Sequence, residues 1–180
     1  MFIRSVVSVA ALVGLTACGG GGGTLGNPID LSIPDASFDD LDTAYDFLKS
    51  YAGSSDSQTF PADTVEYNGV ILMAENLSAG GSSTGYLGQI KLTANFAGTN
   101  GLDLTGEANN FYVSPLDALG DPDGPGTLVA GSPTLDLTSN ERTLENFDLA
   151  VSGTVDGLTI TGSIDSEFKL GNAAAVTGFT

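Results

Sequence analysis

Carboxylates are the side chains of this sequence that offer the most chemistry, because it holds 22 Asp and Glu but no His. Without His, the chain cannot build a Ser-His-Asp triad, a His-ligated zinc site or a haem site with an axial His. A glycosidase needs two carboxylates ~5–10 Å apart in a cleft, and no such pair is marked. We therefore expect no enzyme activity and interpret the glutamates as surface charge: Glu66, Glu75, Glu107, Glu141, Glu145 and Glu167.

Three aspartates in one loop are the weak candidates for a metal site. Asp117, Asp121 and Asp123 precede Gly124, and carboxylates at alternate positions before a glycine are typical of calcium loops. The closing Glu of an EF-hand is missing, however, and prolines stiffen the segment. We therefore favour a plain acidic turn and expect no metal or cofactor.

The single cysteine, Cys18, follows a short apolar run that begins after Arg4. This run, residues 6–15, is shorter than the ~20 apolar residues that span a bilayer. The tetrapeptide Leu15-Thr16-Ala17-Cys18 resembles the lipobox of bacterial lipoproteins, whose cysteine is lipidated and becomes the first mature residue. The sequence therefore predicts a signal peptide at 1–17 and lipidation at Cys18. An ordinary secretory peptide with a chance cysteine is the alternative.

A glycine-rich tether, 18–33, is predicted after the lipidated cysteine. It contains five consecutive glycines, Gly19 to Gly23, and random-coil scaling gives it a reach of ~20 Å. The net charge of the whole chain is −17, which excludes a nucleic-acid partner because phosphates would be repelled. The same charge favours a basic partner.

A short helix with its following loop is predicted over 34–59. Apolar residues recur at helical spacing from Phe38 to Tyr51, and Ser37 is placed to cap the first turn. Aspartates in the first turn complement the helix macrodipole. We interpret the acidic side of this helix as a solvated face. The expected apolar face consists of Phe38, Leu41, Ala44, Tyr45, Leu48 and Tyr51.

From residue 60 to 180 the apolar pattern has period 2, which predicts half-buried antiparallel strands. The pairs Asn100-Gly101 and Asp156-Gly157 mark two related hairpins. The predicted strands are 66–74, 86–96, 102–111, 127–138, 146–154, 158–169 and 174–179. An up-and-down meander of this length hides its edges by closing into a soluble barrel of about eight strands, with a β-sandwich as the alternative.

Several phrases of the strand region resemble the β-barrel domain of the transferrin-binding protein B-like surface lipoproteins, a group that includes the factor H-binding lipoprotein. The resemblance covers about residues 60 to 180. In that family at least one more strand usually follows the segment corresponding to 168–179, whereas this sequence ends at Thr180. The phrases are Tyr67-Asn68-Gly69, Tyr86 to Phe96, Gly106 to Phe111, Phe147 to Gly153 and Leu158 to Gly162.

The resemblance implies an eight-stranded soluble barrel that is anchored to the outer membrane, often on the cell surface, and captures a protein or an iron-related ligand. Transferrin binding is not implied, because the large ligand-binding lobe of the two-lobed members is missing here. The leading hypothesis is thus a non-enzymatic binding lipoprotein with a basic partner favoured. The alternatives are a structural or accessory lipoprotein and a barrel that spans the outer membrane.

Overall fold

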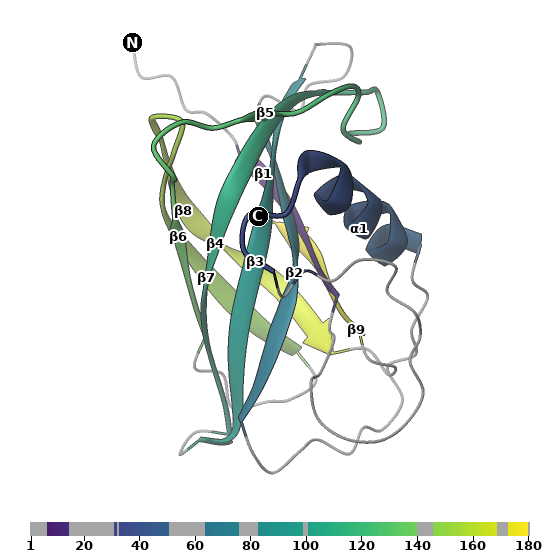
Figure 1. Ribbon diagram of the computed structural model, residues 1–180. Helices are drawn as coiled ribbons and strands as arrows, with labels where there is room; N and C mark the ends of the chain where they lie inside the picture. Colours follow the sequence, from purple (N-terminus) through teal and green to yellow (C-terminus); the bar gives the residue numbers. More distant parts are fainter. Residues whose placement is uncertain are drawn as a thin grey trace.

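The computed structural model describes residues 7–14, 31, 33–50, 64–75, 83–98, 101–139, 146–168 and 173–179. These contain one helix and nine strands (Figure 1). The helix is α1 (Phe38–Ser50), and the strands are β1 (Val7–Gly14), β2 (Thr64–Glu75), β3 (Ser83–Gly98), β4 (Gly101–Leu116), β5 (Thr127–Leu128), β6 (Leu135–Ser139), β7 (Asn146–Val155), β8 (Leu158–Phe168) and β9 (Ala173–Phe179).

The predicted helix is confirmed, together with its cap. The Asp40 N–H donates to Ser37 Oγ (3.2 Å), while the Ser37 N–H donates back to an Asp40 carboxylate oxygen (3.2 Å). This reciprocal arrangement satisfies two backbone donors that the first turn leaves without partners. The expected apolar face is buried at every position whose side chain is described: Phe38, Leu41, Ala44 and Tyr45.

The mainly β prediction is also confirmed, because the seven strands β2 to β8 form one antiparallel sheet. Consecutive long strands pair with each other from β2 through β3 and β4 to β6, β7 and β8, as in a meander. Within these seven strands, β2 and β8 do not pair with each other. These strands alone therefore do not make a closed barrel.

Two further strands lie between β2 and β8 and come from the two ends of the chain. Strand β1 pairs antiparallel with β2, from Val7 opposite Glu75 to Leu12 opposite Val70. Strand β9 pairs antiparallel with β8 and with the end of β1. The pairing that links β2 to β9 thus runs through β1, which falls inside the predicted signal peptide.

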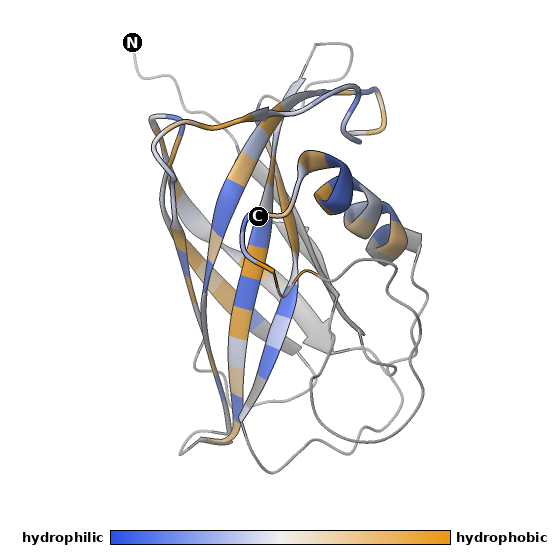
Figure 2. Cartoon of the chain, viewed as in Figure 1, coloured by the Kyte–Doolittle hydropathy of each residue, from blue (hydrophilic) through white to orange (hydrophobic). Residues whose placement is uncertain are grey.

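Hydrophilic and hydrophobic residues alternate along the strands (Figure 2), and many of the hydrophobic ones are buried in one cluster. Strand β6 shows this plainly, since Leu135 and Leu137 are buried while Asp136 and Thr138 are exposed. The interior is filled by its own side chains, which pack into one apolar cluster. Its fully buried members include Ile71, Met73, Ile90, Leu104, Phe111, Leu135, Leu137 and Leu149.

A second apolar cluster lies outside the sheet, beneath α1. The helix contacts β1, β2 and β3 and places its apolar face on the outward side chains of the sheet. Strand β2 is consequently buried on both faces, because Ile71 and Met73 point to the interior and Val70 and Leu72 point to the helix. The helix therefore covers the outer face of the sheet where β1 and β2 pair.

Two details of the predicted strands need correction. The single strand expected over 127–138 is wrong: it is split into β5 and β6, because two successive residues between them, Gly131 (85°) and Ser132 (47°), have positive φ and turn the chain. The Asp156-Gly157 turn has the expected positive φ values (49° and 78°). In the other hairpin Gly98 pairs with Gly101, so Gly101 belongs to the strand rather than to the turn.

Tyr67 predicts a loss of stability at alkaline pH. Burial raises the pKa of its phenol to about 12, because the charged phenolate would be removed from water. A raised pKa favours the neutral form in the folded state, so this stabilisation is complete below pH 10 and is lost as the pH rises toward 12. We expect the melting temperature to fall steeply over this range. The Tyr67→Phe variant should show a shallower fall; an unchanged slope would contradict the assignment.

Candidate functional site

The most distinctive surface of the described chain is the segment between β4 and β6, residues 117–131, which we call the platform loop. Asp117 organises its first turn. The backbone N–H of Asp117 donates to the Asp121 carbonyl (2.8 Å), and the Gly120 N–H donates to the Asp117 carbonyl (3.1 Å). Asp117 Oδ1 accepts from the N–H groups of Leu119 (2.7 Å) and Asp121 (3.0 Å). One side chain thus fixes the turn.

The charge of Asp117 is part of this geometry. The hydrogen bonds from the backbone of Asp121 and then Leu119 hold the pKa of the Asp117 carboxyl below its ordinary value. Such bonds favour the ionised form, because a carboxylate accepts hydrogen bonds more strongly than a protonated carboxyl group. With a lowered pKa, the carboxylate stabilises the turn above its ordinary pKa, and this contribution is lost as the pH falls.

The platform loop is fastened to α1 at two points. Lys49 forms an ion pair with the carboxylate of Asp121, 72 residues away in sequence. This hydrogen bond raises the pKa of Lys49. Nearer β5, the backbone of Gly126 lies directly on the Phe38 ring, so that a Cβ at this position would come within 2.1 Å of Phe38 Cδ2. Only glycine fits there, which explains how the loop approaches the helix so closely.

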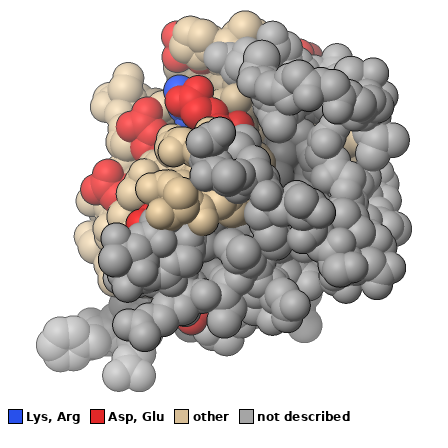
Figure 3. All heavy atoms as spheres, turned by 90° about the horizontal axis from the view of Figure 1, so that it is seen from below, with Lys and Arg blue, Asp and Glu red and all other residues tan. Residues whose placement is uncertain are grey.

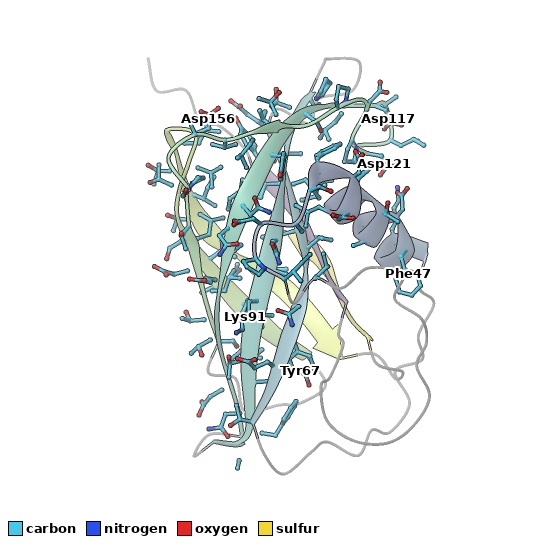
Figure 4. All side chains as sticks on the ribbon, in the orientation of Figure 1. Phe47, Tyr67, Lys91, Asp117, Asp121 and Asp156 are labelled. Carbon is cyan, nitrogen blue, oxygen red and sulfur yellow. The ribbon has the colours of Figure 1, made fainter. Side chains whose placement is uncertain are left out.

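Two large apolar side chains project from this fixed loop into solvent. Leu119 is 83% exposed and Leu128 is 57% exposed. Leucine side chains with this exposure contribute little to the stability of the fold. Figure 4 places Asp117, Asp121 and Asp156 at the same end of the sheet. The platform loop therefore presents apolar anchors among acidic groups.

The acidic surroundings extend onto α1. Burial raises the pKa of the Asp42 carboxyl, and the neighbouring charges of Asp46, Asp39 and Asp121 raise it further. The carboxylates of Asp46, Asp39 and Asp121 thus repel that of Asp42. Figure 3, seen from below, shows the same excess of acidic over basic side chains on another face.

The three weak calcium candidates do not converge. Asp117 uses its carboxylate on backbone N–H groups, Asp121 is paired with Lys49, and Asp123 is exposed with its N–H bonded to the Pro115 carbonyl (2.9 Å). Within the described part of the chain, no three acidic or Cys side chains are grouped as metal ligands would be. The platform loop is thus held by protein groups.

The remaining predicted site residues are scattered or fall outside the described residues. Glu66 forms an exposed ion pair with Lys91 (3.0 Å), and Glu107 accepts a hydrogen bond from Asn109 (3.3 Å). Glu75 lies at the end of β2. Cys18, Glu141 and Glu145 lie outside the described residues, as does most of the predicted tether, and the side chain of Glu167 is not described.

Gln89 and Asn110, which the sequence did not mark as site residues, form a polar clamp on the outer face of the sheet. Gln89 Nε2 donates to the carbonyls of Leu31 (2.8 Å) and Ile33 (2.6 Å), and Gln89 Oε1 accepts from the Ala36 N–H (3.4 Å). Asn110 Nδ2 donates to the Ala36 carbonyl (2.7 Å). The clamp holds the segment that leads into α1. In the sequence, Gln89 only occupies an outward position of an alternating strand, which carries no signal of burial.

Replacing Lys49 with Gln should loosen the platform loop without unfolding the domain. The ion pair is partly exposed, since the Lys49 and Asp121 side chains are 46% and 25% exposed, so we expect a loss of at most about 1 kcal/mol in stability. The backbone amides of Leu119 and Asp121 should nevertheless exchange faster with solvent, which hydrogen-exchange mass spectrometry would detect. The Lys91→Gln variant, which removes the ion pair with Glu66, is the control that should leave these amides unchanged.

No family model, curated protein or solved structure matches this chain. Among the described residues, no helix has the length and apolar character needed to cross a membrane. The relation to the transferrin-binding protein B-like lipoproteins is therefore a proposal that rests on the sequence resemblance alone.

Proposed function

We propose that this chain is a non-enzymatic binding lipoprotein, anchored in the outer membrane through Cys18, which captures a basic protein partner on its platform loop. The observation that carries the proposal is the pair of exposed leucines, Leu119 and Leu128, on a loop fixed by hydrogen bonds, an ion pair and glycine packing. A preorganised loop that exposes apolar side chains can bind a partner with little loss of entropy.

A surface site is favoured over an internal one by the packing of the sheet. The interior is occupied by large side chains, including Phe111 and Met73, that pack against one another. We propose that β2 to β9, the strands that remain after removal of residues 1–17, curve into a soluble barrel that is like that of the transferrin-binding protein B-like lipoproteins and is open only between β2 and β9. A barrel filled in this way offers its outer loops for recognition, which makes a protein partner a better fit than an iron-related solute.

The outward side chains support a barrel in water over one that spans a membrane. Asp136, Asp148 and Ser152 are exposed on the outer face of β6 and β7. A lipid-facing strand needs apolar residues at these positions, because charged groups there are costly in the bilayer. This polar exterior accords with a domain held at the membrane by a lipid at Cys18.

The charge of the surface indicates the chemistry of the partner. The platform loop and α1 carry several carboxylates, among them Asp117, Asp121 and Asp42, and the chain has only 5 Lys and Arg against 22 Asp and Glu. A partner with an apolar pocket bordered by Lys and Arg would match this arrangement. Charge complementarity of this kind speeds association and weakens with salt.

Lipid attachment and surface display are tested on the chain expressed in a Gram-negative host. We expect the intact mass of the membrane-extracted protein to show loss of residues 1–17 and acylation of Cys18. Protease added to intact cells should then degrade the domain if it faces outward. A protein without an acyl group would refute the lipoprotein part of the proposal.

The binding surface is tested by comparing capture of proteins by the lipidated chain and by a Leu119→Ser, Leu128→Ser variant. A genuine partner should be retained by the unaltered protein, be lost from the variant and elute with increasing salt. The Ile33→Ser variant is the matched control, because Ile33 is 48% exposed but lies outside the platform loop. Equal capture by all three proteins would exclude the platform loop as the binding surface.

A further inference from the structure

Strand β1 is part of the sheet of the full chain, but it cannot be part of a mature protein that begins at Cys18. Its backbone, Val7–Gly14, completes the sheet between β2 and β9. The same residues lie in the predicted signal peptide, which is removed when Cys18 becomes the first mature residue. If the proposed function holds, processing therefore takes a strand out of the sheet.

The edge exposed by this removal is unlike an ordinary sheet edge. The β2 residues that faced β1, Val70 to Glu75, belong to a strand buried on both faces, with the interior cluster on one side and the cluster beneath α1 on the other. Backbone N–H and C=O groups in such surroundings are nearly always paired, since leaving them without partners is costly. Natural edge strands avoid this exposure by charge, proline or a covering segment.

Strand β9 cannot simply take the place of β1. Because β1 runs antiparallel to both β2 and β9, those two strands run parallel to each other. Direct contact between β2 and β9 would replace antiparallel pairing by a parallel one with a different hydrogen-bond pattern. The strand that fits between them runs antiparallel to both.

We propose that the β2 edge of the mature lipoprotein, Val70–Glu75, is an acceptor for a strand donated by another polypeptide. The chain's own leader shows the chemistry that fits: an uncharged, mainly apolar segment of about six residues in extended conformation, antiparallel to β2. Apolar residues are needed at consecutive positions because both faces of the neighbouring strand are buried. This acceptor edge is separate from the platform loop and rests on the processing step of the proposed function.

The experiment compares the mature lipoprotein with an unprocessed Cys18→Ser chain, both purified in the same mild detergent. The probe is a labelled peptide with the sequence of Val7–Gly14 and added terminal lysines, and binding is followed by fluorescence anisotropy. Hydrogen exchange reports on those amides of Val70–Glu75 that point away from β3. A peptide with proline at the positions of Val9 and Ala10 is the control, because one of two adjacent amides faces β2.

We expect the peptide to bind the mature protein saturably and to slow exchange of these β2 amides at least about tenfold. The proline peptide should not bind. The Cys18→Ser chain should bind neither peptide and should protect the same amides without any addition, because β1 is present in the same molecule.

Three results would overturn the inference: binding to both proteins or to neither, full protection of the β2 amides in the mature protein without peptide, or a mature dimer that excludes the peptide. Mass spectrometry keeps the two proposals distinguishable. A lipidated protein that ignores the peptide leaves the proposed function intact. A chain that retains residues 1–17 refutes both the lipoprotein and the acceptor edge.

Discussion

The Phe111→Ala variant should lose about 4 kcal/mol of unfolding free energy, the largest effect of a single side chain that we expect in this protein. Phe111 is fully buried in the interior cluster. Its ring lies against Gly88, where a Cβ would come within 2.4 Å of Phe111 Cε1. Removing the ring therefore leaves a cavity that the surrounding strands fill only in part.

The contact between Gly88 and Phe111 can be measured with a double-mutant cycle. Gly88→Ala alone should destabilise the protein by about 2 kcal/mol, because the added methyl group would collide with the ring. In Gly88→Ala, Phe111→Ala the collision is absent, so the combined loss should be smaller than the sum of the two by at least about 1 kcal/mol.

Chemical denaturation of the four proteins, followed by circular dichroism, gives these free energies. Leu128→Ala is the control for truncating an apolar side chain, and its effect should stay within about 0.5 kcal/mol because Leu128 is exposed. Strictly additive effects of the two interior substitutions would show that the ring and the glycine are not in contact.

Replacing Gln89 with Leu should cost about 3 kcal/mol and lower the melting temperature by roughly 10 °C. Leucine has a similar size but cannot bond to the carbonyls of Leu31 and Ile33 or to the Ala36 N–H. These backbone groups would then stay buried without partners. The segment before α1 should detach first, which would be seen as faster hydrogen exchange near Ala36 and in the first turn of the helix.

Thr105→Leu is the matched control for Gln89→Leu, because Thr105 is an exposed polar residue on the adjacent strand β4. It should change stability by no more than about 0.5 kcal/mol. If Gln89→Leu were equally mild, water or other groups would have to satisfy the segment before α1, and the clamp would not hold it.

The local elements could be predicted because their signals lie close together in sequence. The Ser37 cap and the apolar spacing of α1 identify the helix, and the alternation of Leu149 and Val151 with exposed neighbours identifies β7. Strand ends were less predictable. Strand β4 continues to Leu116 past Asn110, whose φ is 51°, because pairing with β3 resumes beyond the irregularity.

The composition of the candidate surface could be predicted from the sequence, but its contacts with α1 could not. The sequence shows that residues 117–126 form an acidic, proline-containing loop, but it contains no sign that Asp121 meets Lys49 or that Gly126 lies on Phe38. The first contact joins residues 72 positions apart, and the second joins residues separated by an even longer stretch of chain. Local pattern carries no information over such distances.

The amino-acid sequence by itself determines the net charge, excludes the catalytic and metal sites that need His, and sets the alternation of apolar and polar residues that makes strands. These properties follow from residue types and short spacings. Only the tertiary structure decides that Gln89 is buried, that two leucines stand exposed on a fixed loop, and that β2 has an apolar layer on each face. Each of these depends on which distant segment packs there, and burial is a property of that packing.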